Sequence, residues 1–233
     1  ITLNYFSGLV IQGLKNDKKA QKKVLYACCG VNVLLLAFFK YTPFFVECLN
    51  NILPFKIPAL HLALPVGISF YTFQAMSYII DVYRMEVPAQ KNFIDFGTYV
   101  ALFPQLIAGP IVRYRTVARQ LKKRTESADK FIEGFTRFVA GLAKKVLIAN
   151  NVGMLWDSIH ALGTSSISVM TAWLGCIAFT LQIYFDFSGY SDMAIGLGKM
   201  FGFNFNENFR YPYISKSVTE FWRRWHISLG TWF

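Results

Sequence analysis

The feature that most constrains this chain is its alternation of long apolar runs with short clusters of basic residues. Hydrophobic side chains make up 54% of the sequence and charged side chains only 16%, far from the composition of a water-soluble domain. The net charge of +11 comes from clusters between the runs rather than from one basic face, so it indicates membrane topology and not nucleic-acid binding. We therefore expect an all-α, polytopic membrane protein that contacts lipid and has no nucleic-acid partner.

The basic clusters suggest an orientation for the apolar runs. Five lysines against one aspartate in residues 15–23 are typical of a cytoplasmic loop. Residues 24–39 form the following span, about 24 Å of helix, which is short for a hydrocarbon core unless the flanking lysines reach the interfaces. Residues 41–58, with three prolines, are then expected as an outer loop. The expected spans are 1–14, 24–39, 59–80, 131–149 and 166–187, with short helices over 188–203 and 218–233.

The apolar stretch 96–112 is unusual because it contains Pro104, Gly109 and Pro110 and is followed by six cations within 113–124. If it crossed the membrane, those cations would lie outside, against the positive-inside tendency. A re-entrant or surface-lying hairpin fits better, and non-helical backbone at membrane depth needs shelter beside protein or a water-filled cavity. A long kinked span with exceptional topology is the alternative.

A polar stripe runs through residues 64–84. Tyr71, Gln74, Tyr78 and Asp81 follow spacings that place them on one face of a helix. Polar side chains within a span avoid lipid, so the stripe either lines a wet tunnel or packs against neighbouring helices. The spacing favours the two interpretations about equally.

Two carboxylates lie near the end of the last apolar run. Asp186 follows that run, and Asp192 lies at the start of the expected short helix, for which Ser188 is a candidate N-cap. Helix capping is the simple interpretation. Carboxylates near a membrane core need partners. The candidates are Arg223, Arg224 and Lys199.

Two further patterns concern how the helices pack. Lys144 and Lys145 interrupt the helical run 131–149, and we expect this helix to be packed inside the protein or tilted because exposing the lysines to lipid would be costly. Ala194, Gly198 and Gly202 recur every four residues, a stripe of small side chains that lets another helix approach closely.

The last segment, FWRRWHISLGTWF, combines aromatic rings with cations and a histidine. The preceding SVTE has capping-box spacing, so a helix is expected to begin there. Steps of 100° place the large apolar residues on one arc and His226 at its edge, beside Arg223 and Gly230. An imidazole between an apolar wall and a polar channel stays neutral, as a general base requires. An interfacial histidine within an aromatic belt, with arginines that reach the headgroups, is the alternative.

The cysteines and the chain ends add two expectations. The four cysteines show no CxxC or Cys/His ligand spacing, so we expect neither a metal site nor a disulfide framework. The chain opens on Ile1 within an apolar run and closes within a motif, so we expect a single transmembrane domain, 1–233, truncated at both ends.

Taken together, these segments resemble the membrane-bound O-acyltransferase (MBOAT) family. The resemblance covers residue 60 to the end. Within the family, the chain is similar to the bacterial branch that includes the alginate O-acetylation and teichoic acid D-alanylation proteins. DFSGYSDMAIGLG and VTEFWRRWHIS favour its polysaccharide O-acetyltransferase side. The segments that carry the resemblance are LPVGISFYTFQAMSYIIDVYR, LFPQLIAGPIVRYR, FIEGFTRFVAGLAKKVLIAN and the run from QIYFDFSGYSDMAIGLGKM to the end.

The resemblance implies a many-helix fold that encloses a tunnel in the bacterial cytoplasmic membrane. It implies transfer of an acyl group, here acetyl, from a cytoplasmic thioester to hydroxyls of an extracytoplasmic polysaccharide, with a partner protein for the transfer. The donor would be acetyl-CoA or an acyl carrier protein, with no bound cofactor. The branch carries two histidines. One matches His226, whereas the second lies in a downstream Trp-His-Gly segment that His61 and His160 do not match, so this chain alone is expected to be inactive.

His226 is the expected catalytic residue. The expected substrate-binding or tunnel-lining residues are Gln74, Tyr78, Asp186, Ser188, Tyr190, Asp192, Arg223 and Arg224. The alternatives within the family are D-alanyl transfer to teichoic acid and peptidoglycan O-acetylation. A solute transporter or scramblase is the alternative from another class, although the chain lacks the internal repeat common in transporters.

Overall fold

The regular structure of the described residues is entirely helical. The computed structural model describes residues 1–58, 63–106, 109–163 and 167–232. They divide into two compact units, Ile1–Leu102 with Arg113–Ala118 and Phe103–Val112 with Arg119–Phe233. The prediction of an all-α fold is confirmed.

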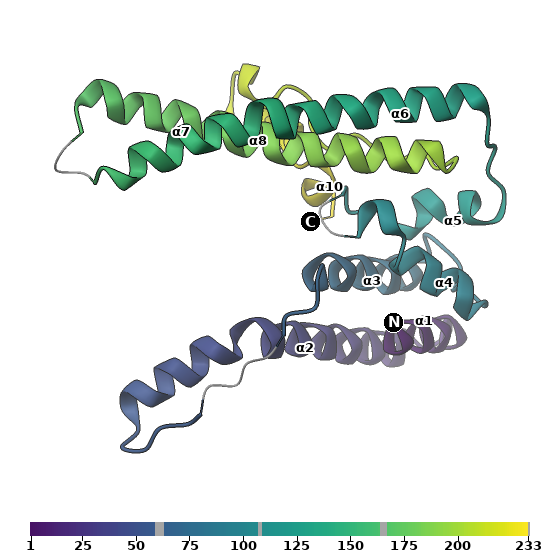
Figure 1. Cartoon of the computed structure of the whole chain (residues 1–233). Helices are drawn as coiled ribbons and strands as arrows, with labels where there is room; N and C mark the ends of the chain where they lie inside the picture. The colour runs from purple at the N-terminus through teal and green to yellow at the C-terminus, as the bar shows by residue number, and fades with distance from the viewer. Residues whose placement is uncertain (59–62, 107–108, 164–166, 233) are drawn as a thin grey trace. The chain divides into compact units, whose positions relative to one another are not determined.

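The first unit packs three helices side by side, α1, α2 and α3 (Figure 1). Its elements are α1 (Thr2–Gly13), α2 (Lys18–Ile52), α3 (Ile68–Tyr83), α4 (Phe93–Val100) and the start of α5 (Tyr114–Lys122). Its core is aromatic: Tyr78 and Phe96 are fully buried with ring centroids 4.6 Å apart, and Tyr99 lies beside Phe96.

Two helices of this unit differ from the sequence expectation: one is longer, and the other begins further along the chain. α2 contains the expected span 24–39 but continues to Ile52 with Pro43 inside it, so the outer loop expected over 41–58 is wrong for 41–52, and only 53–58 are non-helical. The Thr42 hydroxyl donates to the carbonyl of Phe38, one turn back along α2. α3 begins at Ile68, after Gly67 in the left-handed region (φ 76°), rather than near residue 59. Residues 59–62 lie outside the described part of the chain.

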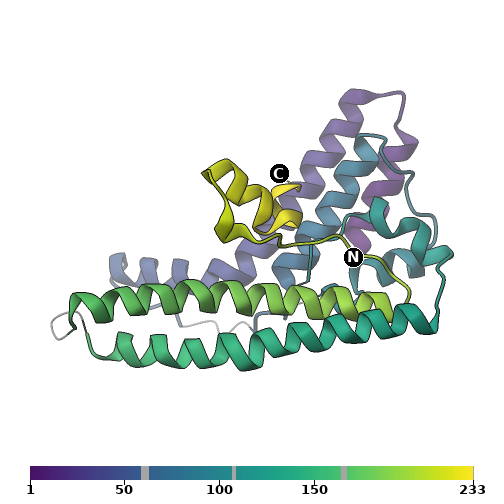
Figure 2. The ribbon, with the colours of Figure 1, turned by 90° about the horizontal axis from the view of Figure 1, so that it is seen from above.

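The second unit is built on a long helical hairpin. Its elements are η1 (Phe103–Gln105), the end of α5, α6 (Ala128–Ala143), the π-helical η2 (Lys144–Ala149), α7 (Asn150–Ala161), α8 (Val169–Met200), η3 (Pro212–Ile214), α9 (Val218–Arg224) and α10 (Ile227–Gly230). α6, η2 and α7 form one continuous rod, Ala128–Ala161, that runs alongside α8 (Figure 2).

Two pairs of glycines bring the rod and α8 into backbone contact. A Cβ added at Gly141 would lie 2.5 Å from the carbonyl oxygen of Gly189, and one added at Gly189 would lie 2.7 Å from that of Gly141. Gly134 and Gly196 repeat this relationship seven residues away along each helix, at 2.6 Å in both directions. Without side chains at these positions the helices approach closely, as small residues allow in membrane proteins.

Three helices within the described residues are long and apolar enough to cross a membrane: Lys18–Ile52, Ala128–Ala161 and Val169–Met200. They leave large apolar side chains exposed, such as Leu34 at 69% and Met170 at 82%. An apolar surface of this extent favours lipid over water as its surroundings. At 1.5 Å per residue, each helix exceeds the roughly 30 Å of a hydrocarbon core.

The expected break near residue 188 is wrong. The predicted span 166–187 and short helix 188–203 form one helix, α8, with Ser188 in its middle, while its N-cap is Ser168. The glycine contact at Gly189 buries α8 against the rod at this point, and that packing outweighs the capping preference of the serine. Residue 166 lies outside the described residues.

The small-residue stripe of α8 has other neighbours than expected. Gly198 accommodates the ring of Phe205, Ala194 lies against Gly109, and Gly202 follows the helix end with φ 80°. Loop residues, rather than another helix, pack at these positions.

The stretch 96–112 is broken as its prolines and glycine indicate. α4 ends at Val100, η1 follows, and residues 109–113 are not helical, while 107 and 108 lie outside the described residues. Its position relative to a membrane stays a prediction.

Candidate active site

The C-terminal segment begins as a helix and then breaks. The Ser217 side chain accepts a hydrogen bond from the backbone N–H of Glu220 at 3.1 Å, which confirms the predicted helix start. The continuous helix expected over 218–233 is wrong, because α9 ends at Arg224 and His226 has a left-handed backbone (φ 45°) before α10. Phe233, expected on the aromatic arc, lies outside the described residues.

The break gives His226 an aromatic environment. Its ring lies edge-on to Phe187, with centroids 4.8 Å apart, and 6.5 Å from the ring of Phe209. Trp225 packs edge-on against the same Phe209 ring, with centroids 5.1 Å apart, and stacks on Phe221. Burial against these rings lowers the pKa of His226 below its ordinary value, so the imidazole is neutral at pH 7.

Asn208 joins the break to the loop that follows α8. It is fully buried, and its backbone carbonyl accepts from the N–H of Ile227 at 2.9 Å. Its side-chain Oδ1 accepts from the backbone N–H of Ser228 at 3.1 Å and from the Ser228 hydroxyl at 2.8 Å. The same hydroxyl lies 3.3 Å from Nδ1 of His226. These bonds replace the helical ladder that a continuous helix would have made.

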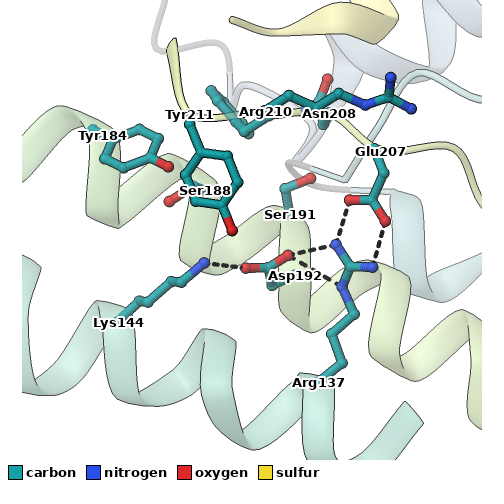
Figure 3. A pocket seen from close by; sticks show the side chains of 11 residues that line it. Arg137, Lys144, Tyr184, Ser188, Ser191, Asp192, Glu207, Asn208, Arg210 and Tyr211 are labelled. Atoms are coloured by element: carbon teal, nitrogen blue, oxygen red, sulfur yellow. Dashed lines mark hydrogen bonds and ion pairs between the residues drawn. The ribbon is translucent and has the colours of Figure 1, made fainter. Parts of the chain in front are cut away.

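A polar pocket of about 280 Å³ includes Asn208 in its lining (Figure 3). Its walls come from the rod, α8 and the loop 207–211. The lining residues are Arg137, Lys144, Tyr184, Ser188, Ser191, Asp192, Glu207, Asn208, Phe209, Arg210 and Tyr211.

One wall of the pocket is a charge cluster of Arg137, Lys144, Asp192 and Glu207. Arg137 binds Oδ1 of Asp192 through Nη2 at 2.8 Å and Nε at 3.1 Å, and binds both oxygens of Glu207, with Nη1 to Oε1 at 2.5 Å. Lys144 Nζ lies 2.6 Å from the other Asp192 oxygen. Two cations and two carboxylates balance, as partly buried charges require.

Three buried polar atoms around this pocket have no hydrogen-bond partner among the described residues: Ser188 Oγ, Ser191 Oγ and Asn208 Nδ2. Buried polar groups are almost always satisfied, so these atoms are available to a polar ligand or to water.

The predicted partners of the carboxylates are wrong. Asp186 pairs with Lys145, and Asp192 pairs with Arg137 and Lys144. The candidates named from the sequence bind elsewhere or face solvent: Arg224 pairs with Glu220 at 2.7 Å, Lys199 pairs with Glu133, and Arg223 is exposed. The two lysines of η2 are half-buried, and each has a carboxylate partner on α8.

The structure divides the remaining predicted site residues between the two units. Ser188 and Asp192 line the pocket, whereas Tyr190, half-buried on the same helix, is not among its described lining residues. In the first unit, Gln74 donates to the carbonyl of Tyr99 at 2.8 Å, and the Tyr78 hydroxyl accepts from the N–H of Gln90 at 2.9 Å. Both side chains are buried, which favours the helix-packing interpretation of the polar stripe over the tunnel.

Sequence reasoning missed Arg137, Glu207, Ser191 and Asn208. A signal was present for the charges, because basic residues in one apolar run and acidic residues in the next predict interhelical pairing. Nothing in the spacing indicates Asn208, whose bonds reach 20 residues along the chain.

The comparisons with known proteins agree with the helical and apolar character of the chain. The family model of the membrane-bound O-acyltransferase family matches residues 84–233. A protein of Pseudomonas putida named probable alginate O-acetylase is 50% identical, over 98% of this chain and 48% of the relative. The peptidoglycan O-acetyltransferase of Helicobacter pylori is 37% identical, over 99% of the chain and 48% of the relative.

A third relative is more distant. The teichoic acid D-alanyltransferase of Bacillus subtilis is 29% identical over 72% of the chain and 43% of the relative. The chain spans about half the length of the curated relatives it matches. On these matches and its apolar helices, the chain is a multi-pass membrane protein that belongs to the membrane-bound O-acyltransferase family.

Proposed function

We propose that the intact protein is a membrane O-acetyltransferase that moves acetyl from a cytoplasmic acyl thioester to hydroxyls of an extracytoplasmic polysaccharide. The observation that carries this proposal is the placement of His226, a neutral imidazole against Phe187, in a chain 50% identical to a probable alginate O-acetylase. A neutral, half-buried imidazole is suited to accept a proton from an alcohol.

The chemistry needs one proton acceptor near the acceptor hydroxyl. His226 takes the hydroxyl proton while the oxygen attacks the thioester carbonyl, forming the C–O bond. The C–S bond then breaks, and the imidazolium returns its proton to the departing thiolate. The net result is an ester and a free thiol, with no oxidant or metal consumed.

The charge cluster gives the pocket a fixed shape. Arg137 binds both Asp192 and Glu207, and Lys144 binds the second oxygen of Asp192, so these four side chains hold one another in place on one wall. Ser188 and Ser191 offer hydroxyls to a polar part of a substrate. Exposed Arg223 offers a cation to an anionic donor.

The donor is acetyl-CoA or an acetylated acyl carrier protein, and the acceptor is reached directly or through an extracytoplasmic partner protein. We place the protein in the bacterial cytoplasmic membrane, and the second histidine in a downstream Trp-His-Gly segment. The test uses the intact protein in proteoliposomes, with acetyl-labelled thioester on one side and an alginate oligosaccharide or the partner protein on the other.

We expect alkali-labile label on the acceptor and one free thiol released for each acetyl transferred. Label only on peptidoglycan fragments or, from D-alanyl thioester, on teichoic acid would assign the protein to the other branch members. Flux of unmodified solute without thioester consumption would contradict the proposal and favour a transporter.

A further inference from the structure

We infer that Asn208 and Ser228 are positioning residues that hold His226 as its Nδ1–H tautomer and leave Nε2 as the proton-accepting nitrogen. The catalytic consequence of this inference rests on the proposed function, whereas the tautomer itself does not. The geometry fixes it in three steps, each of which depends on which group must donate.

The first step is the orientation of the Asn208 amide. The backbone N–H of Ser228 points at one terminal atom of this side chain from 3.1 Å. A backbone N–H can only donate, so the atom it reaches is the carbonyl oxygen, Oδ1, and not the NH₂ group.

The second step is the direction of the Ser228 hydroxyl. Its Oγ lies 2.8 Å from the same Oδ1, a distance typical of an O–H···O bond. Because Oδ1 can only accept, the hydroxyl hydrogen points at Asn208. Ser228 Oγ then has only lone pairs to offer any other neighbour.

The third step is the imidazole. Nδ1 of His226 lies 3.3 Å from Ser228 Oγ. Facing an oxygen that can only accept, Nδ1 carries the hydrogen in the neutral ring, and the lone pair is on Nε2. A chain of bonds thus runs from Nδ1–H to the hydroxyl and on to the amide oxygen.

Burial and backbone contacts keep these hydrogen bonds in place. Asn208 is fully buried and Ser228 is 8% exposed, so water does not replace either bond easily. Asn208 also accepts from the N–H of Ile227, which holds the backbone turn in which His226 has φ 45°. Neither residue has to contact substrate to act, since each works through the imidazole.

Ser228→Ala is the sharper test, because Asn208→Leu removes both bonds that Oδ1 accepts and threatens folding. The variant keeps the bond from the Ser228 N–H to Asn208 and removes only the oxygen facing Nδ1. Ser228→Thr restores the hydroxyl. Thr231→Ala is the matched control, since it removes a hydroxyl in the same turn that bonds the carbonyls of Ile227 and Ser228.

Two measurements on the intact protein are needed. The first is the ¹⁵N spectrum of protein labelled at histidine, in detergent at neutral pH, with His226→Gln used to assign the His226 signals. We expect a protonated Nδ1 and a bare Nε2 in the wild type and in Ser228→Thr, and a mixture of tautomers in Ser228→Ala. A wild-type His226 protonated on Nε2, or an unchanged tautomer in Ser228→Ala, would overturn the inference.

The second measurement is acetyl transfer. We expect Ser228→Ala to lower kcat about 10- to 100-fold with an unchanged KM for the thioester, by analogy with the loss of hydrogen-bond partners that orient metal-binding histidines. Ser228→Thr and Thr231→Ala should stay near wild type. Wild-type kcat in Ser228→Ala would overturn the positioning role. If His226→Gln keeps full activity while the spectra show the Nδ1–H tautomer, the proposed function fails and the tautomer assignment stands.

Discussion

The imidazole of His226 lies edge-on to the phenyl ring of Phe187, with centroids 4.8 Å apart and planes at 84°. An apolar ring replaces water beside the histidine, and burial lowers the pKa of His226. We therefore predict that kcat/KM rises with pH and reaches its plateau below neutrality, with a midpoint under the ordinary value of about 6.5. Rates measured from pH 5 to 8 check this, and a midpoint of 7 or above would contradict it.

The same shift has a consequence for stability. Since the folded pKa is lowered, the unfolded chain takes up the proton first as the pH falls. The stability contributed by the neutral imidazole is complete above about pH 6.5 and declines as the pH falls toward the folded pKa. Thermal unfolding of wild type and His226→Ala at pH 5 and 8 should show a smaller acid loss in the variant. Equal losses in the two proteins would argue against a buried neutral histidine.

Replacing Phe187 tests the aromatic wall itself. Phe187→Gln puts a polar group beside the ring, so the midpoint of the pH profile should move up toward the ordinary histidine value. Phe187→Leu retains an apolar neighbour and serves as the control, with the midpoint near that of wild type. The idea fails if the two variants shift the profile equally.

The charge cluster predicts a loss of stability on removal of Arg137. Arg137→Leu leaves Glu207 without its partner and Asp192 with Lys144 alone. We expect a loss of about 1–3 kcal/mol in the free energy of unfolding, less than for a fully buried pair because the Arg137 side chain is 31% exposed. Arg115→Ala, which breaks a more exposed pair with Glu86, should cost under about 1 kcal/mol. Unfolding in detergent gives the free energies of both variants. Equal losses would mean that the charge cluster contributes no more to stability than an exposed ion pair.

The glycine contacts predict a sharp difference between equivalent substitutions. Gly141→Ala forces a methyl group to within 2.5 Å of the Gly189 carbonyl oxygen, so the helices must separate, at a cost of about 1–3 kcal/mol. Gly30 lies in α2, and a Cβ added there by Gly30→Ala meets nothing within 4 Å. It should stabilise the protein by roughly 0.5–1 kcal/mol. Thermal unfolding midpoints of the two variants and wild type check this. An unchanged midpoint in Gly141→Ala would contradict the close approach of the two helices.

Local capping signals in the sequence predict the start of α9 but not its end. Ser217 and its capping spacing place the start of α9 correctly, because the cap bonds span only three residues. The end of α9 at Arg224 depends on Asn208, which lies before the helix in the chain and bonds residues beyond it. Long-range contacts of this kind leave no mark in helical periodicity.

The sequence predicts only part of the candidate site, because the rest depends on the same kind of long-range contact. His226 was identified from its family context, whereas its aromatic neighbours Phe187 and Phe209 come from another helix and loop. The sequence offers Arg223, Arg224 and Lys199 as partners for Asp186 and Asp192. The actual partners are Lys144, Lys145 and Arg137, which reach the carboxylates across the helix pair. Interhelical geometry, set by the glycine contacts, decides which charges meet.

The most direct measurement of the central claim is acetyl transfer by the intact protein with and without the His226 imidazole. His226→Ala and wild type, matched for amount in the membrane and for thermal unfolding, are given labelled acetyl thioester and the acceptor. With His226 as the proton acceptor, the variant should lose about 10²- to 10⁴-fold in kcat while it still binds the thioester. Transfer at the wild-type rate by the His226→Ala protein would contradict the account.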